Sequence, residues 1–246
     1  MAEHSYLVVE AFSETASFRI PEYHNYHKTL PLPPPTAVIG MIGASLGLSP
    51  EKAQSLFDVV KPELGVYGTY NGIFKDLWKI ASTKKGTVSS IVQREYLYNN
   101  DYILVVGADN ETIQKLYKAV SYNKYPITAG NSDSLVKILY CYIVGSDCIV
   151  STNEVEHCVL FGDYRQCLKF GLESMEPNKV YVYKKRFAPQ TYNIPVAFDY
   201  DSEGCRTIRM RKEVTFVCTR QELNGVAPLK ALQYGEKRIP LFTYYG

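Results

Sequence analysis

The sequence predicts an α+β fold that is rich in strands. Three observations support this: apolar and polar residues alternate in many short segments, two segments have helical periodicity, and these elements follow a recognisable order. A period of two indicates a strand and a period near 3.6 indicates a helix. The first strand covers residues 5–12, where Leu7, Val9 and Ala11 share one side. Residues 31–35 hold four prolines, which predict a stiff extended run.

A helix that contains glycine follows this run. Thr36 is expected to cap a helix over Ala37–Leu46. Gly40 and Gly43 lie on one face of it, and because glycine weakens a helix, we expect both to allow a close backbone approach. Residues 49–57 begin with Ser-Pro and predict a second, short helix.

The next part of the chain predicts two strand pairs. Residues 63–82 form one pair with a turn at Tyr70–Gly72, and residues 88–106 form another with a turn at Asn99–Asp101. Residues 82–87 lie between the pairs and include two adjacent lysines. They predict a basic hairpin tip.

A helix at Thr112–Tyr122 and an apolar strand at Leu135–Val144 complete the first part. The order strand, helix, strand, strand, helix, strand predicts a ferredoxin-like sheet, an arrangement shared by RNA-recognition modules. We place a boundary near residue 146, after which the chain is rich in strands and turns. Further strands are expected at 148–151, 157–161, 179–187, 196–200, 206–218 and 238–244.

The composition is that of a soluble globular protein. Of 246 residues, 46% are hydrophobic and 21% are charged, which excludes a disordered, collagen-like or coiled-coil chain. The formal net charge is only +2, so any nucleic-acid site has to be local. The longest nearly apolar run, Ala37–Leu48, is shorter than the roughly 20 residues of a membrane span. We expect a cytoplasmic protein without a membrane partner.

The motifs of common enzymes and metal sites do not occur in the sequence. There is no P-loop, dinucleotide fingerprint, nucleophile elbow or H-E-x-x-H motif, so no cofactor is expected. The six cysteines form no C-x-x-C pair, which argues against a zinc site. Cys141, Cys148, Cys158 and Cys218 lie in apolar segments and are expected to be reduced core residues.

Basic residues gather in three places and could contact phosphates. The alternative for each cluster is a solvated strand face, although interleaved tyrosines at 181, 183 and 192 favour nucleic acid. The clusters are Lys75, Lys79, Lys84, Lys85 and Arg94; Lys184, Lys185 and Arg186; and Arg206, Arg209, Arg211 and Lys212.

The loop at residues 19–28 is rich in residues that could carry chemistry. A histidine base and a cation can cleave RNA without metal, which makes Tyr23, His24 and His27, with Lys28 as the cation, a candidate catalytic group. His24 and His27 could also hold a metal, with Glu22 as the one nearby carboxylate. The third interpretation is a surface loop that binds a partner.

A polar turn at residues 130–134 is a second candidate binding segment. Gly130 permits a close approach of the backbone to a phosphate, and Asn131 and Ser132 can bond to sugar or base edges. The alternative is an ordinary turn before the next strand.

Two of these segments together resemble a known family. Phe18–Pro21 followed by Leu32–Ala44 is similar to the N-terminal signature of the Cas five family, a RAMP-type group of CRISPR-associated proteins. Tyr125–Asp133 resembles the second motif of that family, with Ala129 where leucine is common. The resemblance covers the first 145 residues, and the remainder fits by length and strand content.

The resemblance implies a subunit of a type I Cascade complex that caps the 5′ handle of the crRNA. Its implied partners are the backbone (Cas seven) subunit, the large (Cas eight) subunit and, through the complex, target DNA. It also implies a RAMP/RRM-like domain at 1–146 with a β-hairpin thumb around 67–95, and a strand-rich C-terminal domain or extension at 147–246. The implied RNA-binding residues are Arg19, Lys28, Thr36, Gly40, Gly43, Lys84, Lys85, Arg94, Gly130, Asn131 and Ser132.

One branch of the family, type I-C, cuts the repeat RNA with a Tyr, a Lys and a His, the last two adjacent. This sequence has no Lys-His dipeptide, and His27-Lys28 has the reverse order. The resemblance therefore favours a structural subunit, with type I-B as the preferred subtype. A metal-independent endoribonuclease is the alternative, and an RRM-like module with another ligand is a third.

Overall fold

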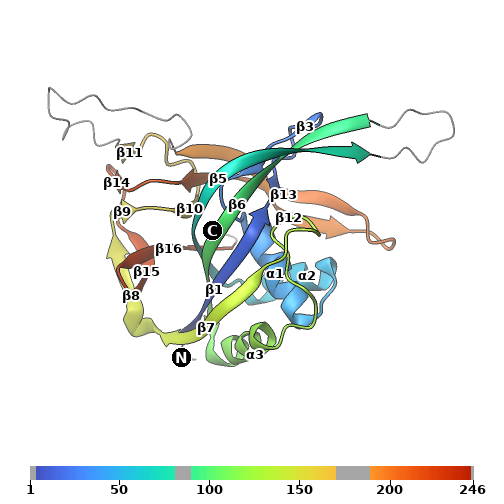
Figure 1. The fold of residues 1–246 in the computed structure, drawn as a ribbon. Helices are drawn as coiled ribbons and strands as arrows, with labels where there is room; N and C mark the ends of the chain where they lie inside the picture. Colours follow the sequence, from blue (N-terminus) through green and yellow to red (C-terminus); the bar gives the residue numbers. More distant parts are fainter. Residues whose placement is uncertain (1–3, 81–89, 170–188, 245–246) are drawn as a thin grey trace, which may run out of the picture.

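The computed structural model describes residues 4–80, 90–169 and 189–244. A strongly curled eleven-stranded sheet dominates these residues, and three α-helices pack against one side of it (Figure 1). The helices are α1 (Pro35–Leu46), α2 (Pro50–Val60) and α3 (Asn110–Ser121). The prediction of an α+β fold rich in strands is therefore confirmed.

Four antiparallel strands form the centre of the sheet in the order β7-β1-β6-β5. They are β1 (His4–Ala16), β5 (Glu63–Ile80), β6 (Ser90–Asp109) and β7 (Lys137–Gly145). Helices α1 and α2 connect β1 to β5, and α3 connects β6 to β7. Two helical connections thus cross the same face of one antiparallel sheet.

The two predicted strand pairs are wrong, because β5 and β6 are each one continuous strand. Gly72 does not make a turn; a Cβ there would lie 2.6 Å from the Tyr98 ring of the neighbouring strand. Asn99 has a positive φ of 50° and lies between the paired residues Tyr98 and Asn100, within the strand. The next residue, Asn100, is fully buried and donates a hydrogen bond to the Ser13 carbonyl at 3.0 Å. These polar residues serve the sheet interior, not a hairpin turn.

Beyond the end of β1, the strands β5 and β6 continue together as a ribbon that projects from the body (Figure 1). We call this ribbon the arm; it comprises residues 72–80 and 90–98. The short strand β3 (Tyr26–His27) pairs in parallel with β6 at the base of the arm. The predicted basic tip, with Lys84 and Lys85, lies outside the described residues.

Helix α1 begins differently from the prediction. Its N-cap is Pro34, whose extended backbone leads into Pro35, and Thr36 lies inside the first turn. The prolines fix φ before the helix starts, so no side-chain cap forms. Helix α2 has the expected Ser49 cap, which accepts a hydrogen bond from the Lys52 amide.

Only one of the two α1 glycines makes the expected close approach. A Cβ on Gly43 would lie 2.5 Å from the Ala53 Cβ of α2, so the helices touch there. A Cβ on Gly40 would meet no atom within 4 Å. Gly40 faces open space, and its predicted packing role is wrong.

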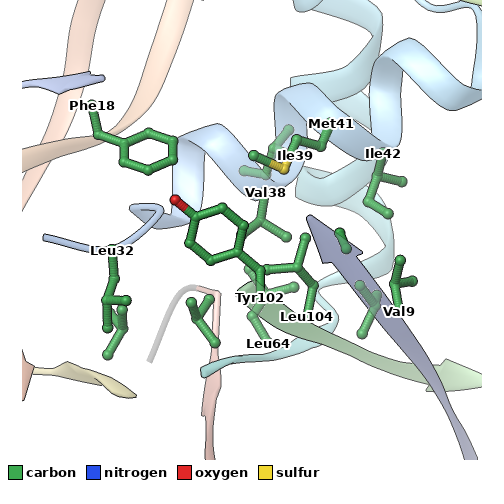
Figure 2. Close-up of a cluster of buried hydrophobic side chains, with 14 of the residues drawn as sticks. Val9, Phe18, Leu32, Val38, Ile39, Met41, Ile42, Leu64, Tyr102 and Leu104 are labelled. Carbon is green, nitrogen blue, oxygen red and sulfur yellow. The ribbon is translucent and has the colours of Figure 1, made fainter. Parts of the chain in front are cut away.

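The main core lies between the helices and the sheet. Val9, Leu64 and Leu104 from the strands meet Val38 and Ile42 from α1 (Figure 2). Side chains alternate across a strand, so the neighbouring residues point to the other face. Burial of these apolar surfaces supplies most of the folding energy.

The second face of the central sheet is also covered. Tyr6 and Ile103 pack there against Leu232 and Ile239 from the C-terminal part. The covering strands are β8 (Ile149–Thr152), β15 (Leu229–Tyr234) and β16 (Lys237–Thr243), and β16 pairs with β5. Residues from both sides of position 146 therefore share the same cores.

The remaining strands of the C-terminal part extend the sheet from β5. They are β10 (Cys158–Phe161), β12 (Gln190–Tyr200) and β13 (Arg206–Val217). Smaller sheets pair β2 (Phe18–Arg19) with β4 (Thr29–Leu30), and β11 (Leu168–Lys169) with β14 (Gln221–Leu223) and β9 (Glu154–Val155). The strand predicted at 179–187 lies outside the described residues.

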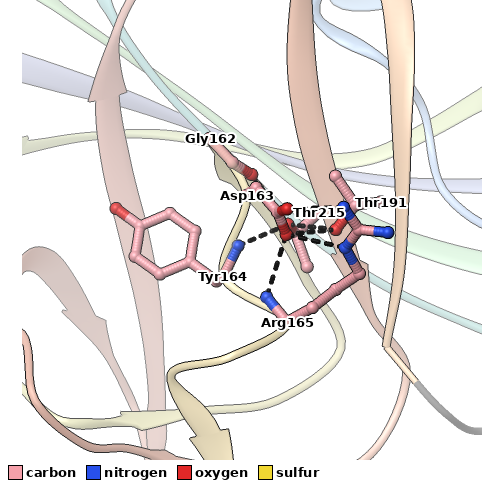
Figure 3. A network of polar contacts seen from close by, with 6 residues as sticks. All are labelled: Gly162, Asp163, Tyr164, Arg165, Thr191 and Thr215. Carbon is pink, nitrogen blue, oxygen red and sulfur yellow. Dashed lines mark hydrogen bonds and ion pairs between the residues drawn. The ribbon is translucent and has the colours of Figure 1, made fainter.

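A polar network fixes the turn after β10 against β13 (Figure 3). The buried Thr215 hydroxyl donates to the Gly162 carbonyl at 2.7 Å and accepts from the Tyr164 amide at 3.1 Å. Asp163 forms two hydrogen bonds with the Arg165 guanidinium, which hold the pKa of this carboxyl well below its ordinary range. The network joins three segments of the C-terminal part.

The cysteines follow the prediction in part. Cys158 and Cys218 are buried, whereas Cys141 and Cys148 are half-buried beside the two cores. In the part of the chain that the structure describes, no helix has the length and apolar character needed to cross a membrane.

Candidate functional site

A groove of about 400 Å³ runs between α1 and the hairpin of β12 and β13. Four of the predicted RNA-binding residues line it, from segments that are far apart in the sequence. They are Arg19, Thr36, Gly40 and Gly130. The opposite wall comes from the C-terminal part, chiefly Pro195, Phe198, Tyr200 and Arg206. The volume is within the range of ligand-binding clefts.

The floor of the groove is a face of α1 that combines small residues with the larger Ile39 and Met41. Thr36, Ala37, Gly40 and Ala44 line this face. Because Gly40 has open space where a Cβ would be, a ligand can approach the helix backbone there. Gly43 packs on α2 and supports the floor from behind.

Two cations line the groove without a competing carboxylate. Among the described residues, neither Arg19 nor Arg206 has an ion pair or a hydrogen bond from its side chain. The Arg206 guanidinium lies 4.8 Å from the centre of the Phe198 ring. Arg209 and Arg211 instead pair with Asp58 at 2.8 Å and Glu22 at 2.6 Å. Of this basic cluster, Arg206 is the residue that remains available to an anion in the groove.

The N-terminus of α1 offers fewer donors than the sequence suggests. Pro34 and Pro35 have no N–H, and the amides of Ala37 and Val38 donate to the Pro34 carbonyl. Within the described residues, the Thr36 amide is the one N–H of this first turn that has no hydrogen-bond acceptor. A phosphate at this end of the helix would have to rely on the arginines.

The turn at 130–134 connects the groove to the arm. Gly130 has φ of +91°, and a Cβ there would overlap the Ser17 carbonyl oxygen, so only glycine fits. Asn131 donates from its amide to the Tyr96 hydroxyl at 3.2 Å, while Ser132 is exposed. The turn thus lines the groove with one end and contacts the arm with the other.

One face of the arm carries two aromatic stacks. The Arg94 guanidinium lies 3.9 Å from the centre of the Trp78 ring, and Phe74 stacks on Tyr96 at 5.2 Å with an angle of 12°. Arg94 also donates to the Tyr96 hydroxyl at 3.4 Å. A guanidinium on an aromatic face is a surface on which nucleobases stack well. Lys75 lies 5.2 Å from the ring of Tyr26.

The predicted catalytic residues Tyr23, His24 and His27 lie in different environments. His27 is 7% exposed, and burial, together with Arg19 and Arg94, lowers its pKa. His24 is exposed, and no hydrogen bond or ring contact joins it to His27 among the described residues. Lys28 lies 5.6 Å from the ring of Tyr23. Among the described residues the two histidines therefore have different environments and no contact with each other.

Some predicted positions cannot be placed. Lys84 and Lys85, the cluster at 184–186 and the tyrosines at 181 and 183 lie outside the described residues. Tyr192 is described, and its hydroxyl donates to Gln190 at 2.6 Å. No cluster of three His, Cys, Asp or Glu side chains suited to a metal occurs within residues 4–80, 90–169 and 189–244.

Sequence reasoning missed the aromatic residues of the site. Trp78 is the single tryptophan of the chain, and it lies opposite Val92, diagonal to Arg94, once β5 and β6 are taken as one hairpin. Phe198 and Tyr200 reach the groove through tertiary packing alone. No local pattern marks these two residues.

Comparisons with known proteins give one family match and several similar folds. A family model described as CRISPR-associated protein (Cas_Cas5) matches residues 6–162. A solved structure from a CRISPR RNA-guided surveillance complex has a TM-score of 0.52 and 14% identity, over 91% of this chain and 91% of its own. A CRISPR protein from Archaeoglobus fulgidus has a TM-score of 0.52 and 9% identity, over 97% of this chain and 99% of its own.

A further solved structure is similar over a smaller part. A Cas protein has a TM-score of 0.36 and 15% identity, and the alignment covers 52% of this chain and 57% of that one. No curated protein matches the sequence. At these identities the structural likeness concerns the fold.

Proposed function

Because this chain belongs to the CRISPR-associated protein (Cas_Cas5) family, we propose that it is the crRNA 5′-handle-binding subunit of a type I CRISPR Cascade complex. Its role in defence against foreign DNA is then structural and not catalytic. The observation that carries the proposal is the groove, where Arg19, Gly40 and Gly130 meet Arg206, which has no ion pair among the described residues. Protein sites that bind single-stranded RNA combine cations for the phosphates with rings on which bases stack, and the accessible backbone lets the RNA come close.

The groove and the arm bind different parts of the RNA strand. Phe198 and Tyr200 offer rings on which a base can stack, while Arg19 and Arg206 neutralise phosphates. The Arg94–Trp78 stack on the arm binds a second part of the strand. The turn at 130–134 lies between the two and keeps the RNA close to the protein.

The proposed domain division follows from the sheet. The order β7-β1-β6-β5 with helices on one face supports a ferredoxin-like, RAMP-type domain over residues 1–146. The arm is then its thumb, whose predicted tip with Lys84 and Lys85 lies outside the described residues. Residues 147–246 act as an extension that covers the second face of the sheet and forms one wall of the groove.

The partners follow from the family. The chain contacts the backbone (Cas seven) and large (Cas eight) subunits, and it meets target DNA through the complex in the cytoplasm. A solved structure described as a CRISPR RNA-guided surveillance complex has a similar fold, which supports this assembly. Type I-B remains the preferred subtype.

The competing function is a metal-independent endoribonuclease built on Tyr23, His24 and His27. General acid–base cleavage requires the base and its proton to lie within hydrogen-bond distance. The burial of His27 and the separate exposure of His24 weigh against this arrangement. The same experiment tests both functions.

Purified chain is mixed with end-labelled cognate repeat RNA in EDTA, and the sample is run on native and denaturing gels. A shifted, uncut RNA is the expected result. A single cut at the 3′ base of the repeat hairpin contradicts the structural role and supports the endoribonuclease. If RNA is neither shifted nor cut, even with the backbone subunit present, the proposed function is wrong.

Variants of the groove make the test specific. Arg206→Gln removes one phosphate contact, so we expect weaker binding and a salt dependence of log K that is less steep by about 0.7. Lys118→Gln removes a cation from α3, outside the groove, and is the matched control. Equal binding by the two variants would show that RNA does not occupy the groove.

A further inference from the structure

Strand β7 forms an edge of the main sheet. It pairs with β1 on one side, and no other strand among the described residues pairs with it. Figure 1 shows it at the margin of the central sheet beside β1, with α3 next to it. Its outer backbone N–H and C=O groups are therefore open to a further strand.

Proteins usually protect such an edge, and β7 is protected over its first residues only. Lys137 places a charge at the start of the strand, and the register shift opposite Glu10 makes a bulge at Leu139. Charges and bulges both discourage strand addition. The following stretch, Tyr140–Gly145, contains no charge, proline or bulge.

Exposed apolar side chains flank this open stretch on both faces. Tyr140 is 58% exposed and Tyr142 is 41% exposed, and their rings stack 6.1 Å apart on one face. On the other face, Leu139 is 40% exposed beside a groove of about 570 Å³ between α3 and β7. A strand added to β7 would cover apolar surface on both sides at once.

The open stretch is complementary to itself. If two copies align antiparallel about a twofold axis at Tyr142, Tyr140 lies opposite Val144 and Cys141 lies opposite Ile143. Because the bulge at Leu139 shifts the ladder by one residue, Lys137 of each copy then comes opposite Ser146 of the other, next to Asp147, so opposite charges approach each other at both ends. A twofold interface requires this self-complementarity.

We propose that β7 is a docking strand for a second copy of this chain, which pairs antiparallel with it about Tyr142. The free protein then forms a twofold dimer with one continuous sheet across the interface. The proposal goes beyond RNA binding, since the groove lies between other elements.

Cysteine scanning tests the register directly. A residue on the twofold axis faces its own copy, with Cα atoms about 4.5–5.5 Å apart, which suits a disulfide. Tyr142→Cys should therefore give a covalent dimer on mild oxidation. Tyr140→Cys should not, because the two positions 140 lie about 13 Å apart along the strands. Wild-type chain controls for the native cysteines.

Sedimentation equilibrium measures the association itself. We expect the fraction of dimer to rise as the protein concentration increases to about 100 μM, as for a weak interface. Tyr142→Lys places two like charges face to face and should give a monomer. Val59→Lys, on the exposed side of α2, should leave the dimer intact.

A wild-type monomer at every concentration overturns the proposal. A dimer that persists in Tyr142→Lys and lacks the Tyr142→Cys cross-link also overturns it, because another surface then associates. The RNA gel of the same variants separates this result from the proposed function. A wild-type monomer that still binds RNA rejects the docking strand alone, and a wild-type dimer that does not bind RNA rejects the RNA site alone.

Discussion

The two glycines of α1 give a prediction in which the same substitution has opposite effects. At Gly43, a methyl group would lie 2.5 Å from the Ala53 Cβ, while ordinary carbon–carbon contacts are about 3.5–4.0 Å. The helices must then separate by about 1 Å. Overpacking of this kind costs about 1–3 kcal/mol.

Alanine also favours a helix over glycine by about 0.5–1 kcal/mol. At Gly43 this gain in helix stability offsets only part of the free-energy cost of overpacking, so Gly43→Ala should destabilise the fold by about 1–2 kcal/mol. At Gly40 a methyl group meets nothing within 4 Å, and only the gain remains. Gly40→Ala should therefore stabilise the fold by about 0.5–1 kcal/mol.

Thermal unfolding monitored by circular dichroism measures both variants. One kcal/mol corresponds to about 2–4 °C for a domain of this size, so the two midpoints should move in opposite directions. The same methyl group at Gly40 narrows the groove, and we expect weaker RNA binding by this more stable variant. If both substitutions raise the midpoint, the α1–α2 contact at Gly43 is not as tight as described.

Three further predictions concern single side chains. Arg94→Ala should shift the fluorescence emission of Trp78 to longer wavelength, because the guanidinium leaves the ring; an unchanged spectrum would contradict the stack. The unfolding midpoint should fall as the pH drops from about 8 to about 5. In the unfolded state His27 binds a proton near its ordinary pKa of 6.5, whereas in the folded state this pKa is lowered and the proton binds only at lower pH, so acid favours unfolding. His27→Leu should flatten this dependence, and the remainder belongs to His157, whose pKa burial also lowers. Thr215→Val removes the hydroxyl that bonds two half-buried backbone groups and should cost about 1 kcal/mol in urea unfolding, whereas the exposed Thr207→Val should cost nothing measurable.

The strength of the sequence analysis lay in local signals. The Ser49 cap, the prolines before α1 and the periodicity of α3 predict three helices at nearly their observed places. The order of these elements with the strands follows from the same signals. Each depends on residues within one or two turns of one another, which the sequence shows directly.

The errors arose where a distant residue decides the conformation. Asn71-Gly72 is a strong hairpin signal, yet the ring of Tyr98 on the neighbouring strand explains this glycine. The residues of the groove likewise come together only through contacts between distant segments. Arg19, Gly40 and Gly130 were found from their motifs, whereas Phe198 joins them only because β12 folds against α1.

The pairing of β16 with β5 has a consequence for biosynthesis. When the ribosome has made β5 and β6, the strands that cover the second face of the sheet do not yet exist. The nascent chain then exposes Tyr6 and Ile103 until Leu232 and Ile239 emerge. Contacts between such distant segments form slowly and leave apolar surface open to aggregation. Expression at low temperature, or together with chaperones and partner subunits, should therefore raise the yield of folded protein.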